Sequence, residues 1–212
     1  MSGRQAQCIS ADDVRALQLA SNALSRGELI VFPTDTVYGI GAAVDRPDAV
    51  ANLYVAKGRP LDKPIPVLIS DIAQLARLAV NFDERAARVA RAFWPGGLTI
   101  VLDAVEWLPK EIVGDTGRVG LRMPDHRFAL DLISQAGGAL ATTSANRSGE
   151  PAATNADDAF EALGEKATVV VDGGQSPGGT NSTVISIAGE TLSVLREGAI
   201  PLDEIAPIFY GS

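Results

Sequence analysis

The chain has 212 residues, of which 46% are hydrophobic and 21% charged, enough for one large domain or two small ones with an ordinary core. A formal net charge of −8 argues against non-specific nucleic-acid binding, because such binding depends on many contacts between cations and phosphates. One cysteine and one histidine exclude an intramolecular disulfide, dithiol redox chemistry and a Cys/His zinc site.

The first half of the chain is predicted to alternate between helices and strands. Ser10 and Asp13 resemble a capping box. The helix that follows is expected to have Val14 as its first apolar position and to end at Gly27. The other elements expected in this half are strands at 29–32 and 65–69, a helix at 47–58, a helical stretch from Asp71 and a helix at 83–93.

The alternation continues in the second half. The elements expected there are strands at 98–102, 119–123, 139–143 and 168–171, helices at 128–135 and 155–163, a hairpin of strands at 183–187 and 191–195, and a possible short helix at 202–209. This order indicates an α/β fold with a mixed sheet and an antiparallel C-terminal ribbon. Since no repeat or low-complexity linker interrupts it, we expect a single domain over residues 1–212.

No feature of the sequence indicates a membrane or secreted protein. No apolar run approaches the ~20 residues that span a bilayer. The N-terminal segment lacks the apolar core of a secretory signal. We therefore expect a cytoplasmic protein without membrane contact.

Polar residues gather in loops that follow predicted strands. Four such segments are rich in hydroxyls, glycines or arginine: Pro33–Gly41, Arg122–Pro124, Thr142–Gly149 and Gly178–Thr183, with Arg196 on a strand that can return beside the last of them. Ligands of open α/β sheets bind in crevices at strand ends. These loops are therefore candidates for one shared site.

Three cations stand close together at the end of the helix at 47–58 and just after it: Lys57, Arg59 and Lys63. Glycine and prolines separate them, and the hydroxyl-rich loop precedes them by about twenty residues. Small residues for close approach, hydroxyl donors and cations are what a phosphate-bearing ligand requires. The usual phosphate-loop and dinucleotide signatures are absent, so any nucleotide is held in another way.

Structural explanations compete with these functional ones. Residues 34–36 can make a hydroxyl turn, the three cations can stabilise a helix end, and residues 144–146 can cap a helix. Arg122 interrupts an apolar strand, where an unpaired charge is costly, so a functional role is favoured for it. His126 is expected to be a turn or cap residue, and Cys8 to be inert.

Six segments, taken together and in order, resemble the YrdC/TsaC family of threonylcarbamoyl-AMP synthases. They are residues 33–41, 56–60, 94–99, 119–124, 143–149, and 182–184 with the closing 195–198. The resemblance runs from about residue 12 to residue 200. It implies an open, twisted α/β sheet with flanking helices around a large, positively charged cavity, in the single-domain form of the family.

The resemblance also implies a reaction. L-threonine, bicarbonate or carbon dioxide, and ATP would give L-threonylcarbamoyladenylate, pyrophosphate and water. A threonylcarbamoyl-transferase complex would then pass the group to an adenosine of tRNA. Mg²⁺ would arrive with ATP, no organic cofactor is implied, and a weak contact with tRNA or double-stranded RNA is possible.

Site residues are carried over where the motif letters match. The threonine site would consist of Thr36, Arg122, Thr142 and Ser182. The ATP site would consist of Lys57, Arg59, Lys63, Ser144, Asn146 and Arg196. Lys57 and Arg59 would face the phosphates and serve catalysis. Leu68 stands where some relatives have a histidine, which puts one threonine contact in doubt.

Two alternative functions are left open. The first is a paralogue that forms a carbamoyl adenylate from carbamoyl phosphate. The second is an RNA-binding or ribosome-associated module without synthase activity, against which the net charge and an aromatic content of 5% both weigh.

Overall fold

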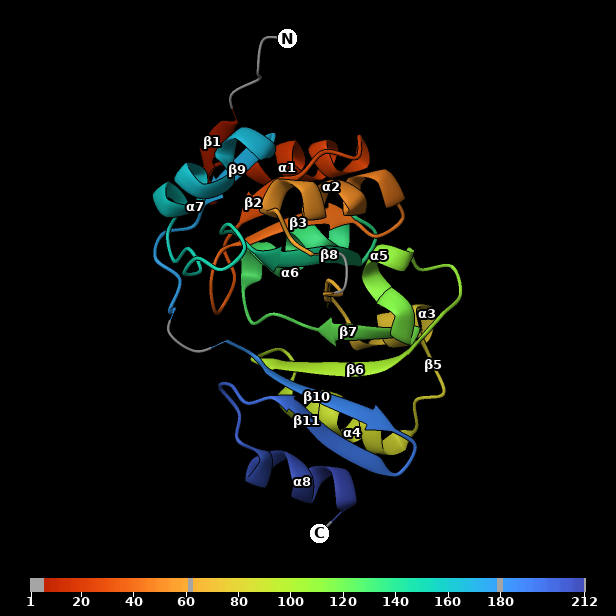
Figure 1. Ribbon diagram of the computed structural model, residues 1–212. Coiled ribbons are helices and arrows are strands. Elements are labelled where there is room, and N and C mark those ends of the chain that lie inside the picture. Colours follow the sequence, from red (N-terminus) through yellow and green to blue (C-terminus); the bar gives the residue numbers. More distant parts are fainter. Residues whose placement is uncertain (1–5, 61–62, 179–180, 212) are drawn as a thin grey trace.

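The computed structural model describes residues 6–60, 63–178 and 181–211 (Figure 1). Its α-helices are α1 (Ala16–Ser25), α2 (Pro47–Lys57), α3 (Leu75–Leu78), α4 (Glu84–Phe93), α5 (Lys110–Val113), α6 (Arg127–Gln135), α7 (Ala156–Leu163) and α8 (Leu202–Tyr210). Short 3₁₀ turns are η1 (Ile72–Gln74), η2 (Gly114–Thr116) and η3 (Gly164–Lys166).

The strands are β1 (Gln7–Ser10), β2 (Ile30–Phe32), β3 (Gly39–Ala43), β4 (Val67–Ile69), β5 (Ala79–Val80), β6 (Leu98–Ala104), β7 (Arg118–Arg122), β8 (Ala139–Ser144), β9 (Val169–Asp172), β10 (Thr183–Ala188) and β11 (Thr191–Arg196). In the described residues they form one sheet of eleven strands, in the order β1-β9-β2-β3-β8-β4-β7-β6-β10-β11, with β5 paired to β6. Parallel and antiparallel neighbours both occur, so the predicted α/β class and mixed sheet are confirmed.

Helices cover both faces of the half of the sheet that contains β1, β9, β2, β3 and β8 (Figure 1). On one face, Ala20 and Leu24 of α1 and Leu132 of α6 pack in one buried cluster with Phe32 and Leu140 of the sheet. On the other face, side chains of α2 and α7 join a larger cluster that includes Val31 and Ile40. This sandwich fixes the strand ends from which the polar loops emerge.

The half of the sheet around β6, β7 and β10 is covered by α4 and α8 on one face (Figure 1). Along its strands, successive side chains point to opposite faces of the sheet, as expected. Val119 and Leu121 of β7 lie in the core, whereas Arg118, Gly120 and Arg122 face the opposite side. That opposite face is the one that carries the polar side chains of the candidate site.

The predicted helix at residues 10–27 begins later than expected. Ser10 is the last residue of β1, and Val14 is 95% exposed rather than part of an apolar face. The Asp13 side chain accepts from the backbone and guanidinium of Arg15, which precedes the first helical residue, Ala16. The capping-box prediction was therefore wrong, because this acid pairs with an arginine before the helix. Gly27, with φ +77°, ends the element as predicted.

The segment Pro33–Gly41, predicted to be one loop, is a turn at residues 33–38 followed by strand β3. The glycines that suggested a loop have another cause. A Cβ on Gly39 would lie 2.8 Å from Thr142 Cγ2, and one on Gly41 would lie 3.0 Å from Phe32 Cε1. The strand needs glycine because its neighbours approach too closely for a side chain. Strands β1 and β5 and helix α5, all short, were also not predicted.

The other predicted elements are confirmed to within a few residues, including the hairpin of β10 and β11 and helix α8. His126 caps α6 by accepting from the amide of Ala129, in the cap role expected for it. Among the described residues, no helix has both the length and the apolar character needed to cross a bilayer.

Tyr38 fastens the turn at residues 33–38 to the segment that follows β9. Its side chain is fully buried. The phenol donates to the carbonyl of Gly174 at 2.7 Å and accepts from the amide of Gly173 at 3.1 Å. The backbone of Tyr38 also pairs with Ala145 and Ala153. The turn is thus held between two loops that are distant in sequence.

We expect Tyr38→Phe to lower the free energy of unfolding by about 1–2 kcal/mol, because it removes two hydrogen bonds between the buried phenol and the backbone of Gly173 and Gly174. Urea unfolding monitored by circular dichroism measures the change. Tyr210→Phe is the matched control, since Tyr210 is 61% exposed, and should change stability by less than about 0.5 kcal/mol. Equal stabilities of the Tyr38→Phe variant and the wild type would contradict this role of the phenol.

Candidate functional site

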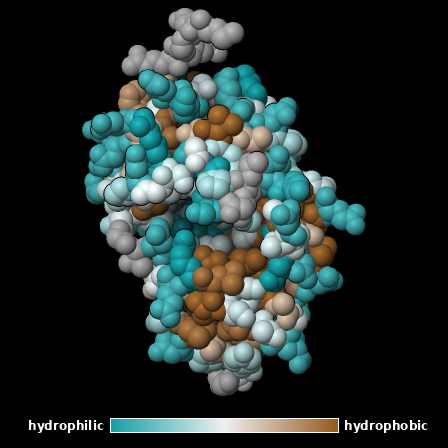
Figure 2. Space-filling model, viewed as in Figure 1, coloured by the Kyte–Doolittle hydropathy of each residue, from teal (hydrophilic) through white to brown (hydrophobic). Residues whose placement is uncertain are grey.

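The polar loops meet at a cavity of about 200 Å³, here called the central cavity. Figure 2 shows a hollow in the middle of the face, above a hydrophobic surface. The described lining residues are Thr34, Thr36, Val37, Tyr38, Gly39, Arg59, Pro66, Leu68, Thr99, Arg122, Thr142, Thr143, Ser144, Asn181, Ser182 and Arg196. The predicted convergence of these loops is therefore confirmed, although residues 179–180 of the last loop lie outside the described residues.

The central cavity brings together most of the predicted site residues. All four predicted threonine-binding residues line it: Thr36, Arg122, Thr142 and Ser182. Of the six predicted ATP-binding residues, the lining includes Arg59, Ser144 and Arg196. The remaining three, Lys57, Lys63 and Asn146, are not among its described lining residues.

Arg122 ends β7, and its guanidinium is nearly buried. Nε donates to the carbonyl of Gly96 at 2.9 Å, Nη1 to Oγ1 of Thr36 at 3.1 Å, and Nη2 to Oδ1 of Asp35 at 2.7 Å. The Arg122 and Asp35 side chains are 10% and 14% exposed. The charge that was expected to need a partner in an apolar strand therefore has one, supplied by the turn after β2.

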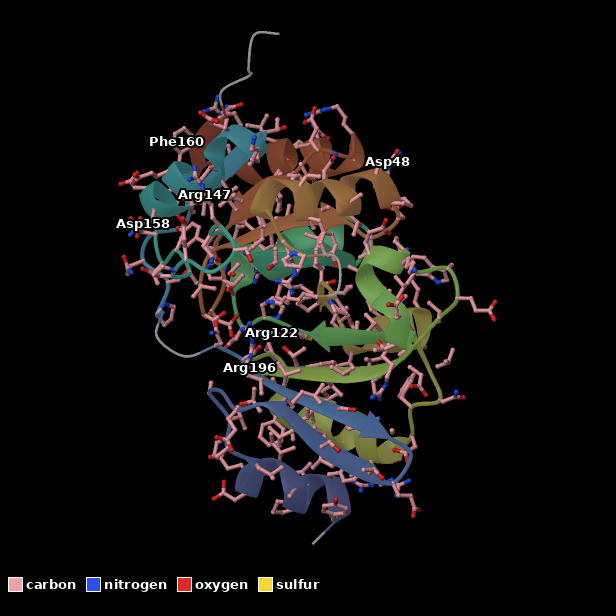
Figure 3. All side chains as sticks on the ribbon, in the orientation of Figure 1. Asp48, Arg122, Arg147, Asp158, Phe160 and Arg196 are labelled. Atoms are coloured by element: carbon pink, nitrogen blue, oxygen red, sulfur yellow. The ribbon has the colours of Figure 1, made fainter. Side chains whose placement is uncertain are left out.

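Arg196 lies beside Arg122 on the same side of the sheet (Figure 3). Its guanidinium donates to the carbonyl of Ser182 at 2.8 Å and to Ser182 Oγ at 3.0 Å. Ser182 Oγ is in turn 2.9 Å from Thr99 Oγ1. Burial and the positive charge of Arg122 both lower the pKa of Arg196. Two arginines that line the same cavity favour binding of an anion there.

Lys57 lies at the end of α2 and is 4% exposed. Its amine donates to the Ser144 carbonyl at 2.5 Å, and lies 3.2 Å from both Ser144 Oγ and Asn146 Oδ1. The Asn146 amide nitrogen donates to the carbonyls of Arg147 and Glu150. Lys57 and Asn146 thus form a buried clamp behind Ser144, which is the member of this group that faces the central cavity.

Arg59 lies at the edge of the central cavity and of a second hollow next to it. It donates from Nε to the carbonyl of Lys63 at 2.9 Å and from Nη2 to the carbonyl of Pro64 at 3.0 Å. These contacts hold the carbonyls of Lys63 and Pro64 against its guanidinium. Lys63 is exposed, and its contact with Arg59 is made by its main-chain carbonyl.

The second hollow, here called the adjoining groove, has a volume of about 500 Å³. It shares Arg59, Pro66, Thr99, Ser182 and Arg196 with the central cavity. Its other described walls are mainly Pro64, Ile65, Val101, Val184 and Leu195, together with Arg118. The two spaces together reach the size of pockets that hold nucleotide-sized ligands.

Two residues of the site were not assigned to it from the sequence. Asp35, taken only as a turn residue, is the partner of Arg122. Thr99 on β6 contacts Ser182. Leu68, which was named as a departure from some relatives, supplies an apolar part of the central cavity. Thr99 carries a usable signal, because it alternates with buried Leu98 and Ile100 on one strand. The partner of Arg122 lies 87 positions away in the sequence, and no local pattern identifies it.

The described residues contain no group of three or more His, Cys, Asp or Glu side chains placed to hold a metal ion.

Comparisons with known proteins identify relatives over nearly the whole chain. A family model that joins Sua5, YciO and YrdC, described as "Telomere recombination", matches residues 22–198. A threonylcarbamoyl-AMP synthase of Pyrococcus abyssi is 40% identical over 192 residues, covering 91% of this chain and 56% of the relative. A putative threonylcarbamoyl-AMP synthase of Mycobacterium tuberculosis (strain H37Rv) is 38% identical over 194 residues, covering 92% of this chain and 89% of the relative.

A solved structure agrees with these relatives. The crystal structure of P. abyssi Sua5 complexed with L-threonine is 40% identical, with a TM-score of 0.87, and the match covers 91% of this chain and 56% of that one. The chain thus spans a little over half the length of its archaeal relative and most of the length of its mycobacterial relative.

The buried Lys57 amine makes stability depend on pH in a defined window. Burial, and secondarily the charge of Arg59, lowers its pKa from 10.5 to about 8. Between these values the unfolded chain binds more protons than the folded one, so the free energy of unfolding rises with pH. We expect this rise in the free energy of unfolding, on the order of 3 kcal/mol across the window, to be absent in Lys57→Met.

Urea unfolding of both proteins from pH 8 to pH 10.5 measures the effect. Lys166→Met, which removes an exposed lysine, is the control and should keep the wild-type slope. Parallel stability–pH curves for wild type and Lys57→Met would contradict the lowered pKa.

Proposed function

The chain belongs to the Sua5–YciO–YrdC family, and we propose that it forms L-threonylcarbamoyl-AMP and pyrophosphate from L-threonine, bicarbonate or carbon dioxide, and ATP. The observation that carries this proposal is the arrangement of Arg122, Arg196 and Ser144 around one cavity. Relatives about 40% identical that are named threonylcarbamoyl-AMP synthases support it.

We assign the threonine end of the site to Arg122 and the hydroxyls around it. The guanidinium offers a planar fork that suits a carboxylate. Thr36, Thr142 and Ser182 lie in the same lining and would orient the amine and the side-chain hydroxyl. Leu68 lies in that lining too, so an apolar side chain stands at the position where some relatives would offer a histidine contact.

The nucleotide end of the site is assigned to Arg59, Arg196 and Ser144. Arg59 and Arg196 border both hollows and would bind the phosphates. The adjoining groove would hold the nucleoside. Lys57 and Asn146 are proposed to act by holding Ser144, and the exposed Lys63 by adding charge at the entrance.

A positive potential in the central cavity is part of this proposal. Its described lining contains three arginines and no aspartate or glutamate. On a chain with a formal net charge of −8, such a local concentration of cations would draw anionic substrates to the site and leave the rest of the surface acidic.

The reaction needs positioning and charge stabilisation more than a protein nucleophile. The threonine amine adds to the carbon of carbon dioxide and loses a proton, which gives a carbamate. A carbamate oxygen then attacks the α-phosphorus, and the bond to the bridging oxygen of pyrophosphate breaks. Arg122 would hold the threonine carboxylate so that the carbamate faces the nucleotide. Arg59 and Arg196 would stabilise the charge that develops on the phosphates.

The substrate is proposed to be Mg-ATP, with the ion carried by the phosphates. A reactive mixed anhydride such as the product needs an acceptor. We propose that a threonylcarbamoyl-transferase complex consumes it in the modification of adenosine in tRNA.

The decisive test is mass spectrometry of the products after incubation with L-threonine, bicarbonate and Mg-ATP, alongside a pyrophosphate assay. We expect threonylcarbamoyl-AMP, and no adenylate when threonine is omitted. A carbamoyl adenylate formed from carbamoyl phosphate would instead identify the paralogue reaction. Absence of pyrophosphate release, together with salt-sensitive RNA binding, would favour the RNA-binding alternative.

Two arginine substitutions should separate the two ends of the site. Arg122→Ala should weaken threonine binding at least ~30-fold, because truncating one partner of a buried charge pair costs about 2–5 kcal/mol. Arg196→Ala should lower kcat by about 10²–10³ and leave threonine binding within a few-fold. Calorimetry and steady-state kinetics measure both effects.

Arg127→Ala serves as the control for both substitutions, since that side chain is 89% exposed on α6. It should behave as the wild type. Unchanged threonine affinity in Arg122→Ala would remove Arg122 from the threonine site.

A further inference from the structure

Asp35 forms a nearly buried ion pair with Arg122, an arginine of the central cavity. We propose that Asp35 is a positioning residue that aims the guanidinium of Arg122 and restricts it to a carboxylate, keeping phosphate groups away. This inference rests on the proposed function. It makes Asp35 the residue that distinguishes the carboxylate-binding end of the site from the phosphate-binding end.

Arg122 has more N–H donors than its protein contacts use. A guanidinium has five N–H groups: one on Nε and two on each Nη. The contacts with Gly96, Thr36 and Asp35 use one N–H on each of the three nitrogens. One N–H on Nη1 and one on Nη2 remain beyond these contacts. Two Nη N–H groups that point to the same side bind a carboxylate through both of its oxygens.

Hydrogen bonds hold the turn that carries Asp35 in place. Thr34 Oγ1 donates to the Val37 carbonyl at 2.6 Å, and Ser176 Oγ donates to the Thr34 carbonyl at 3.0 Å. The amide of Gly178 donates to the Thr36 carbonyl at 2.8 Å. The carboxylate is therefore presented from a braced loop. Strands β3, β8 and β4 separate β2, from which this loop starts, from β7, which carries Arg122.

The two neighbouring arginines differ in whether a carboxylate pairs with them. Arg122 carries a counter-charge at 2.7 Å in a nearly buried pair. For Arg196, the described part of the chain supplies no carboxylate within ion-pair distance, and its contacts are with Ser182. A polyphosphate placed at Arg122 would meet the negative charge of Asp35 in a poorly screened setting, whereas a phosphate at Arg196 would not. A carboxylate accompanied by an amine carries less negative charge and is repelled less.

Two substitutions separate aiming from anion selection. Asp35→Ala removes both the acceptor and the charge, whereas Asp35→Asn keeps an acceptor oxygen and removes the charge. Asp103→Ala is the matched control, because it also removes the carboxylate partner of an arginine on β7. That arginine, Arg118, lies four residues before Arg122 on the same face of the strand and outside the central cavity.

We expect Asp35→Ala to raise the KM for threonine about 10–100-fold, with the KM for ATP and kcat at saturating threonine within about three-fold of wild type. Asp35→Asn should restore most of the threonine KM. Pyrophosphate at saturating ATP should compete with threonine in both Asp35 variants and not in wild type or Asp103→Ala. Thermal unfolding of each variant accompanies the kinetics.

An unchanged threonine KM in a folded Asp35→Ala variant would overturn the aiming role. So would a parallel rise of both KM values with a lowered melting temperature, because it would mean a structural role only. If Asp35→Ala does not fold, the pyrophosphate pattern in Asp35→Asn decides, and an unaltered pattern overturns the anion selection.

Failure of the proposed function is distinguishable from failure of this inference. A wild-type protein that forms no threonylcarbamoyl-AMP refutes the function. Calorimetric titration of wild type and both variants with threonine still tests Asp35 in that case.

Discussion

The burial of one guanidinium on strand β7 is the constraint on which the site depends. Arg122 occupies the last position of a strand whose other face lies in the core, and its charge must be compensated where water has little access. Compensation comes from the turn after β2 and from the loop before β6, at Asp35, Thr36 and Gly96. The need to pair a single charge therefore draws together segments that the sheet itself keeps apart.

On the strands around the site, the side chains that pack in the core alternate with those that face the ligand-binding hollows. On β6, β7 and β10, alternate side chains pack beneath α4 and α8, and the intervening ones face the two hollows. Stability and ligand contact are thus assigned to different residues of the same strand. The face that packs can stay apolar, and the other face can vary its chemistry with little effect on the core.

The order of elements and the meeting of the polar loops at one cavity could be predicted from the sequence, because hydrophobic periodicity and hydroxyl- and arginine-rich loops are local signals. The failures have physical causes. Gly39 and Gly41 indicated a loop, but they serve a strand that has no room for side chains. The Lys57 amine contacts Ser144 and Asn146, and only three-dimensional packing determines that direction. Asp35 gained its role from a partner far along the chain.

The Lys57 clamp joins the final turn of α2 to the end of β8 through one buried amine. Whatever steadies Ser144 from the cavity side must also steady the helix behind it. Ligand binding in the central cavity should therefore slow the exchange of the α2 amide hydrogens with deuterated solvent. This exchange rate would report on binding without any substitution or attached probe.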